Sequence, residues 1–218
     1  MKIVDLTYDI EEGMLTFHAP WHPKVTIKQM GRIEVEGRET REVTFGTHTG
    51  THIDAPLHFL KGSKSIERIP LSQLIGPVTI VDFSFMKEYE NVTAQMLKGI
   101  TLTERMVFKF GWGKYWGNKE KFYYSYPAFT EDAARLFVEK GVRVLGMDTP
   151  SPDDSRTKMG TSEDSKIHKI LLKAEIVLLE YLANLNDLTD YKDWNISIMP
   201  LRLKGADGAP ARVCLYKD

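Results

Sequence analysis

The chain has 218 residues, of which 42% are hydrophobic and 27% are charged, and its formal net charge is -1. A chain of this length and composition is long enough to bury a sizeable core. Because it has no surplus of Lys and Arg to neutralise phosphates, we expect neither nucleic acid nor an acidic membrane as a partner.

Cysteine usage and the first residues bear on the cellular compartment. The one cysteine, Cys214, cannot form an internal disulfide, which fits a reducing environment. Asp5 and Asp9 interrupt the apolar run that a signal peptide requires. We also find no window with the roughly 20 apolar residues of a membrane span. We therefore expect a soluble, cytoplasmic protein.

Short runs that are rich in β-branched residues and bounded by Gly, Pro or Asp predict strands along the whole chain. In chain order these are residues 2–7, 24–30, 41–48, 77–85, 106–112, 142–148, 174–182, 195–203 and 211–217. The run 174–182 is also compatible with a helix.

Helices are fewer. Residues 130–141 predict one, with Thr130 as the N-cap, apolar residues at helical spacing and Gly141 as the stop. Residues 162–174 indicate a second helix, capped by Ser162 or Ser165, and residues 93–99 a short third. Gly and Pro are evenly spread and mark no linker. We therefore expect one α/β domain, residues 1–218, with a large mixed or antiparallel sheet.

The stretch FGTHTGTHIDAPLHF, residues 45–59, holds three of the six histidines. His48 and His52 have the i, i+4 spacing of a helical zinc motif. However, the β-branched residues around them, Gly50 and Pro56 all disfavour a helix.

An extended chain that continues from the strand at 41–48 is the better interpretation. Its side chains alternate, so His48, Gly50, His52 and Asp54 would share one face. Gly50 would then leave open space between the two imidazoles, and a metal ion would fill that space. Imidazole nitrogen and carboxylate oxygen suit Zn²⁺ and Mn²⁺ alike.

Other candidate residues lie outside this face. His58 follows Pro56 and could be a fourth ligand or an acid/base. His168 lies in the second predicted helix, and Glu180 lies in an apolar run. A buried carboxylate costs several kcal/mol unless it is paired or metal-bound. Glu180 is therefore either a ligand, a salt-bridged core acid or an exposed residue of a helix.

Aromatic and histidine residues elsewhere have simpler interpretations. His18 and His22, in FHAPWHPKV, are expected to be loop residues and not ligands. Trp112, Tyr115 and Trp116 could wall an aromatic substrate pocket, but such residues more often pack on their own domain.

Residues 48–58 contain the complete signature His-x-Gly-Thr-His-x-Asp-x-Pro-x-His. With it the chain resembles the cyclase-like metal-dependent hydrolases, which include bacterial kynurenine formamidase and isatin hydrolase. LGMDTPSPD, residues 145–153, is similar to the Gly-x-Asp-Thr-x-Ser segment of that family. Residues 168–185 are similar to its later His-to-Glu segment, and residues 205–213 to its C-terminal strand.

The resemblance implies a swivelling β/β/α fold, usually dimeric, with one or two divalent metal ions. Zn²⁺ is the expected ion, and Mn²⁺ is the alternative. The matching positions imply His48, His52 and Asp54 as ligands of the first metal. Asp54 and Glu180 would bridge to a second metal, with His168 as its further ligand, and His58 would be the acid/base.

The N-terminal segment departs from the family. Kynurenine formamidases carry Gly-Met-Pro and then Trp-Pro-Gly, whereas this chain has Gly13-Met14-Leu15 and then FHAPW, residues 17–21. Because the segment helps to form the substrate pocket in the family, Phe17 or Trp21 would replace the tryptophan as an aromatic wall. The resemblance therefore supports the metal site better than the substrate.

The leading hypothesis is a metal-dependent amidohydrolase that opens the C–N bond of an aryl formamide such as N-formylkynurenine. One alternative is a hydrolase of a cyclic amide or lactone, as in isatin hydrolase. Another is a metal- or ligand-binding protein without turnover. A small-molecule substrate is expected in the first two cases, together with a homodimer or higher homo-oligomer.

Overall fold

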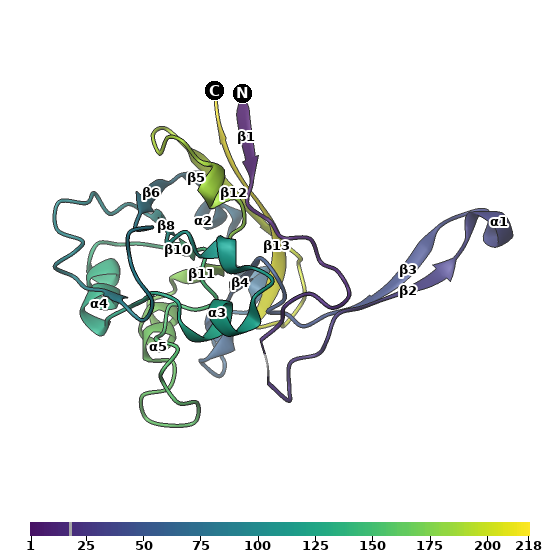
Figure 1. Cartoon of the computed structure of the whole chain (residues 1–218), viewed down its shortest axis with the longest axis horizontal. Helices are drawn as coiled ribbons and strands as arrows, with labels where there is room; N and C mark the ends of the chain where they lie inside the picture. Colours follow the sequence, from purple (N-terminus) through teal and green to yellow (C-terminus); the bar gives the residue numbers. More distant parts are fainter. Residues whose placement is uncertain (18) are drawn as a thin grey trace.

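The computed structural model describes residues 1–17 and 19–218, so His18 lies outside the described residues. Within this part of the chain, the largest sheet has nine strands (Figure 1). They are β1 (Lys2–Asp5), β4 (His52–Asp54), β5 (Ile75–Pro77), β6 (Thr79–Asp82), β8 (Arg105–Lys109), β10 (Val144–Met147), β11 (Val177–Glu180), β12 (Asn195–Pro200) and β13 (Gly208–Lys217).

The order of this sheet is β5-β12-β13-β4-β11-β10-β8-β6, with β1 paired to β13. Strands β6, β8, β10 and β11 run parallel, whereas β4 is antiparallel to both β11 and β13. The short strand β4 therefore lies at the junction of a parallel half and an antiparallel half. This confirms the expected α/β class with a large mixed sheet.

Two cores cover the opposite faces of the parallel strands. Helices α4 (Glu131–Glu139) and α5 (Lys166–Lys173) contribute Phe137 and Leu171, which pack in one core with Phe108 of β8. The neighbouring Val107 points to the other face, into a second core with Val213 of β13. This alternation is what a strand buried on both faces requires.

The remaining elements are short. They are the helices α1 (Ile33–Glu36), α2 (Leu71–Leu74) and α3 (Lys119–Tyr124), the 3₁₀ turns η1 (Pro56–His58), η2 (Ile66–Arg68), η3 (Trp112–Tyr115) and η4 (Leu185–Asp187), and the strand pairs β2 (Thr26–Gly31) with β3 (Thr40–Thr44) and β7 (Asn91–Val92) with β9 (Ala128–Phe129). Figure 1 shows the β2–β3 hairpin reaching out from the body of the molecule. None of the helices described is long and apolar enough to cross a bilayer.

Each predicted strand run overlaps an observed strand, and the ambiguous run 174–182 contains β11. The two longer helices are α4 and α5, with Thr130 and Ser165 at their N-cap positions. The predicted helix at 93–99 is wrong. Its backbone makes i to i−3 turns, because so short a segment does not repay the nucleation of a helix.

Candidate active site

Strand β4 brings the first two candidate ligands together. His52 and Asp54 lie two residues apart in β4, so their side chains share a face, and both are buried. The antiparallel register pairs His52 with Glu180, the last residue of β11. Because directly opposed residues project to the same side of a sheet, the register brings the Glu180 carboxylate to the His52 imidazole.

His48 reaches the site by another route than the one predicted. Strand β3 ends at Thr44, and the chain bends before β4 begins, so no continuous strand carries His48 and His52. Gly50 has φ +58, a left-handed conformation that favours glycine. A Cβ there would lie 3.1 Å from Met14 Cε, so the predicted open space for a metal at Gly50 is wrong. The turn, and not strand alternation, directs His48 inward.

His168 reaches the site from the first turn of α5. Asp153 accepts hydrogen bonds from the backbone N–H groups of Ile167 (2.8 Å) and His168 (3.1 Å). The same carboxylate lies 2.5 Å from His168 Nδ1. Asp153 therefore caps the helix and orients the imidazole, leaving Nε2 to face the site.

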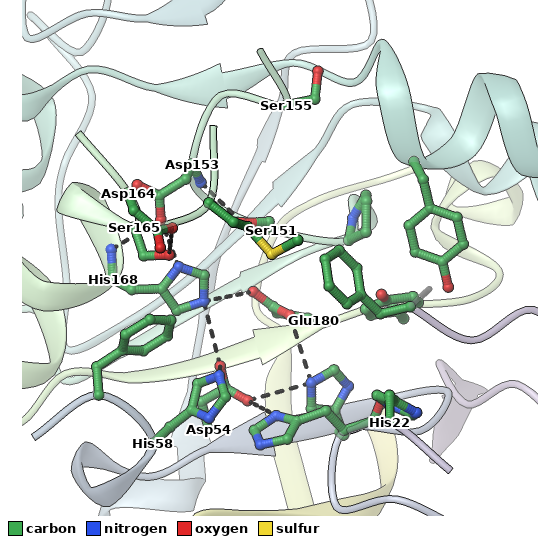
Figure 2. A pocket seen from close by; sticks show the side chains of 18 of the residues that line it. His22, Asp54, His58, Ser151, Asp153, Ser155, Asp164, Ser165, His168 and Glu180 are labelled. Carbon is green, nitrogen blue, oxygen red and sulfur yellow. Dashed lines mark hydrogen bonds and ion pairs between the residues drawn. The ribbon is translucent and has the colours of Figure 1, made fainter. Parts of the chain in front are cut away.

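Two carboxylates and two imidazoles form the centre of the site (Figure 2). His52 Nε2 lies 3.3 Å from Asp54 Oδ1 and 3.5 Å from Glu180 Oε2. His168 Nε2 lies 3.4 Å from both Asp54 Oδ2 and Glu180 Oε1. Each carboxylate thus presents one oxygen to each imidazole.

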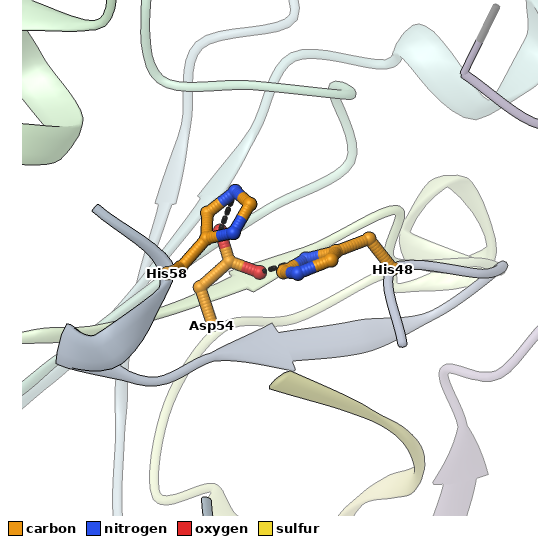
Figure 3. A group of neighbouring side chains, drawn as sticks. All are labelled: His48, Asp54 and His58. Carbon is orange, nitrogen blue, oxygen red and sulfur yellow. Dashed lines mark hydrogen bonds and ion pairs between the residues drawn. The ribbon is translucent and has the colours of Figure 1, made fainter. Parts of the chain in front are cut away.

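The imidazoles of His48 and His58 both face the Asp54 carboxylate (Figure 3). His48 Nδ1 is 2.7 Å from Asp54 Oδ1, and His58 Nε2 is 4.0 Å from Asp54 Oδ2. The His58 side chain, which follows the β4 strand on η1, keeps 27% of its surface exposed. It can therefore contact both the buried centre and a molecule in front of it.

The site concentrates negative charge. Burial by itself would lower the pKa of His48, but the Asp54 and Asp207 carboxylates outweigh it and raise that pKa to about 10. The pKa of Asp54 is lowered, because His48 and His58 outweigh the effect of burial. The pKa of Glu180 is raised by burial and by the neighbouring Asp54. Without a cation, the raised pKa values of His48 and Glu180 mean that bound protons balance the negative charge of the site.

The donor set fits a divalent metal ion. Ligand atoms of His52, Asp54 and Glu180 lie within 4.8 Å of one another, as do those of His48, Asp54 and His58. Glu180 Oε1 is buried and has no hydrogen-bond partner among the described residues. Such an oxygen is costly unless a cation or a donor meets it, and imidazole with carboxylate is a donor set of zinc and manganese.

The centre opens into a cavity of about 780 Å³. Aromatic residues form much of its wall, namely Phe17, Trp21, Phe59, Tyr123, Tyr124, Tyr126 and Tyr181. Both predicted substrate contacts, Phe17 and Trp21, are thus placed at the cavity. Among the described residues that line it, none is Lys or Arg.

The favoured interpretation of Trp112, Tyr115 and Trp116 is confirmed, because none of the three is among the residues that line this cavity. They pack within the domain instead: Trp112 is 3% exposed, and Trp116 stacks on Tyr8 with 4.0 Å between ring centroids.

Sequence reasoning missed two acids of the site. Asp153 and Asp207 both hydrogen-bond candidate site histidines, although neither was singled out. Both lie in segments that carry the family resemblance, at residues 145–153 and 205–213. That placement was the available signal, and only the folded geometry shows which histidines they contact.

A buried cluster of imidazoles and carboxylates that opens into a cavity, on this mixed α/β sheet, is the arrangement of a metal-dependent hydrolase. The family described as "Putative cyclase" matches residues 4–154, which is more than half of the chain. The chain belongs to this family.

Two similar proteins are named as kynurenine formamidases. The kynurenine formamidase of Geobacillus thermodenitrificans is 33% identical over 176 residues, covering 81% of this chain and 79% of that protein. The kynurenine formamidase of Bacillus cereus is 33% identical over 179 residues, covering 80% and 78%. These relatives place the chain among amide-hydrolysing enzymes of the family.

Solved structures share the fold. An isatin hydrolase bound to the product analogue thioisatinate superposes with a TM-score of 0.88 at 23% identity, over 100% of this chain and 93% of that one. A "predicted metal-dependent hydrolase" from Bacillus stearothermophilus superposes with a TM-score of 0.78 at 28% identity, over 98% and 97%. The first match shows the fold alone, and the second also carries the metal-dependent hydrolase description.

Proposed function

We propose that the protein hydrolyses the C–N amide bond of an aryl formamide such as N-formylkynurenine, with a metal-activated water. The observation that carries this proposal is the pair of carboxylates, Asp54 and Glu180, which share two imidazoles at the floor of an aromatic-walled cavity. The 33% identity to kynurenine formamidases supports the choice of substrate.

The family resemblance supplies the proposed ligands, and the distances between them support it. His48, His52 and Asp54 would hold the first metal, and His168 would hold a second, with Asp54 and Glu180 shared between them. Zn²⁺ is our first choice and Mn²⁺ the alternative. A bound divalent ion lowers the pKa of its water to about 7 and polarises the substrate carbonyl.

The residues of the chain then have defined tasks. The aromatic walls exclude water from around the aryl ring and orient it, so that the amide carbonyl meets the centre. The amine that leaves must gain a proton, and His58 borders both the centre and the cavity. His58 Nε2 would take a proton from the attacking water and deliver it to the departing nitrogen.

A second candidate reaction is hydrolysis of a cyclic amide or lactone. It is favoured by the cavity lining, where none of the described residues is Lys or Arg. The α-carboxylate of N-formylkynurenine would find no such cation there, whereas a neutral ring such as isatin needs none. The isatin hydrolase that superposes on the whole chain has the same fold.

One preparation, loaded separately with zinc and with manganese, distinguishes these reactions. Release of kynurenine from N-formylkynurenine and opening of isatin are followed by absorbance on the same protein. Faster kynurenine release supports the formamidase proposal. Metal-loaded protein that opens only isatin would replace it with the second candidate.

Variants separate an enzyme from a binding protein. Asp54→Asn should lose metal and turnover together, because it removes the carboxylate that both imidazoles face. His58→Ala should keep metal and lose turnover. A His58→Ala protein with full activity would remove the acid/base role, and a wild-type protein that binds metal without turnover would leave the non-catalytic alternative.

The compartment and the assembly belong to the same proposal. We place the enzyme in the cytoplasm on its single cysteine, and as a homodimer or higher homo-oligomer on its family membership. Light scattering after size-exclusion chromatography tests the assembly. A monomeric mass at micromolar concentration would contradict it.

A further inference from the structure

Asp207 lies immediately before β13 and accepts three hydrogen bonds. His48 Nε2 lies 2.8 Å and His58 Nδ1 3.1 Å from the same oxygen, Oδ2. Thr47 Oγ1 donates to the other oxygen, Oδ1, at 2.9 Å. The two imidazoles lie against each other beside it in a tilted arrangement, with 3.9 Å between centroids and 34° between planes. One carboxylate oxygen thus contacts both a candidate metal ligand and the candidate acid/base.

The sheet fixes the position of this carboxylate. Ala55 N–H donates to the Asp207 carbonyl at 2.9 Å, and the next residue, Gly208, pairs with Asp54 across the β4–β13 ladder. A Cβ at Gly208 would lie 2.7 Å from Ile53 O and 2.8 Å from His48 Cε1. The backbone at this point therefore lies directly under the His48 ring, so Asp207 cannot move away without disturbing β4.

We propose that Asp207 is a positioning residue that fixes the tautomers of both histidines. With the Nε2 proton of His48 held by Asp207, Nδ1 is the nitrogen left to bind a cation, and it lies 2.7 Å from Asp54 Oδ1. With a proton on Nδ1 of His58, Nε2 carries the lone pair that faces the centre, 4.0 Å from Asp54 Oδ2. The nitrogen that binds a metal or transfers a proton is set by the hydrogen bond of the other nitrogen.

The role in proton transfer rests on the proposed function, but the tautomers do not. A neutral imidazole can carry its proton on either nitrogen, so without an acceptor at Asp207 the His58 ring would divide between two forms. Because His58 in the wrong tautomer cannot accept a proton at Nε2, the loss falls on kcat more than on KM. Because His48 in the wrong tautomer lacks its ligating lone pair, zinc affinity falls as well.

Two variants separate hydrogen-bond acceptance from charge. Asp207→Ala removes the acceptor and should lower kcat about 100-fold, within the range of general acid–base catalysis, with KM changed less than about 3-fold. Asp207→Asn keeps one amide oxygen for the two imidazoles and can donate its N–H to Thr47 Oγ1. It should therefore retain kcat within about 10-fold of wild type.

Glu67→Gln is the matched control. Glu67 Oε2 accepts a hydrogen bond from Gly205 N–H at 3.0 Å, in the turn that leads to Asp207, and has no contact with the histidines among the described residues. This variant perturbs the same turn without touching the carboxylate of Asp207. It should keep kcat, KM and zinc affinity within about 2-fold.

The tautomers are measured directly by nitrogen NMR on zinc-loaded protein labelled with ¹⁵N-histidine. The expected result is a proton on Nδ1 of His58 and Nε2 of His48 in wild type, mixed forms of His58 in Asp207→Ala, and zinc affinity at least about 10-fold weaker in that variant. Unchanged tautomers and affinity in Asp207→Ala would overturn the proposal, as would equal losses in Asp207→Ala and Asp207→Asn. These readouts need no substrate, so they decide the role of Asp207 even if N-formylkynurenine and isatin are both refused.

Discussion

Asp153 should be important for both the stability of α5 and the metal centre. Ser165 occupies the N-cap position of α5, but it has φ 52 and its side chain makes no capping hydrogen bond. Asp153 instead accepts from the N–H groups of Ile167 and His168, and its Oδ2 lies 2.5 Å from His168 Nδ1. We therefore expect Asp153→Ala to destabilise the protein and to weaken metal binding.

The size of the effect follows from these contacts. Loss of an N-cap costs about 1 kcal/mol, and loss of a hydrogen bond to a charged group costs about 2 kcal/mol. The sum of about 3 kcal/mol corresponds to a fall in Tm of roughly 6–12 °C for a chain of this length. Because His168 also loses its orienting partner, zinc affinity should fall about 10–100-fold.

Thermal unfolding followed by circular dichroism, with and without zinc, measures both effects. Ser165→Ala is the matched control, since it alters the N-cap position that the sequence would favour but removes no capping bond. It should change stability by less than about 0.5 kcal/mol. The reasoning is refuted if Asp153→Ala unfolds within about 1 °C of wild type, or if Ser165→Ala is the more damaging change.

Four further predictions concern other parts of the molecule. Partial burial would raise the pKa of Asp82, but hydrogen bonds from Ser84, Tyr191 and Lys109 hold that pKa below its usual range. The ionised Asp82 therefore adds to the free energy of unfolding above about pH 4, and this contribution is lost as the pH falls further. Urea unfolding at pH 7 and pH 3 should show a smaller decrease in the free energy of unfolding for Asp82→Asn than for wild type. Gly208→Ala should destabilise by about 1–3 kcal/mol and displace His48, with at least a 10-fold loss of kcat/KM that kinetics would detect. Zinc at 100 times its Kd should stabilise the metal-stripped protein by about 2.7 kcal/mol, and a Tm that ignores zinc would contradict the metal site. Phe17→Ala should raise KM for an aryl substrate about 2–10-fold and leave kcat unchanged, which steady-state assays on one substrate would test.

The sequence predicted the elements of the fold well, because each strand run carries its own β-branched pattern and each long helix its own apolar spacing. It also predicted that His52 and Asp54 share a face, since two residues inside β4 do alternate as strands must. The same period fails between His48 and His52. There the left-handed conformation of Gly50 ends the alternation. From the sequence alone, a glycine that leaves space between side chains cannot be told from a glycine that allows a turn.

Long-range contacts could not be predicted in the same way. Asp207 lies 159 residues from His48 and 149 from His58, and it reaches them only because the β4–β13 register sets Gly208 opposite Asp54. A one-residue slip in that register would turn the side chains to the other face of the sheet. Glu180 was a candidate from its apolar run, but only the family resemblance favoured a ligand, because its surroundings fit a strand and a buried helix equally well.

The residue after Glu180 shows how the fold fits the site to its cavity. Successive side chains of a strand point to opposite faces, so Glu180 and Tyr181 should diverge. Tyr181 instead has φ +57, which is uncommon for a bulky residue, and both side chains line the cavity. Tyr181 N–H donates to Thr149 O, and the Tyr181 carbonyl accepts from Thr51 Oγ1, so hydrogen bonds on both sides hold the strained backbone. Because strain of this kind persists only where the surroundings enforce it, the left-handed turn favours a functional role for Tyr181 as the wall next to the Asp54 and Glu180 carboxylates.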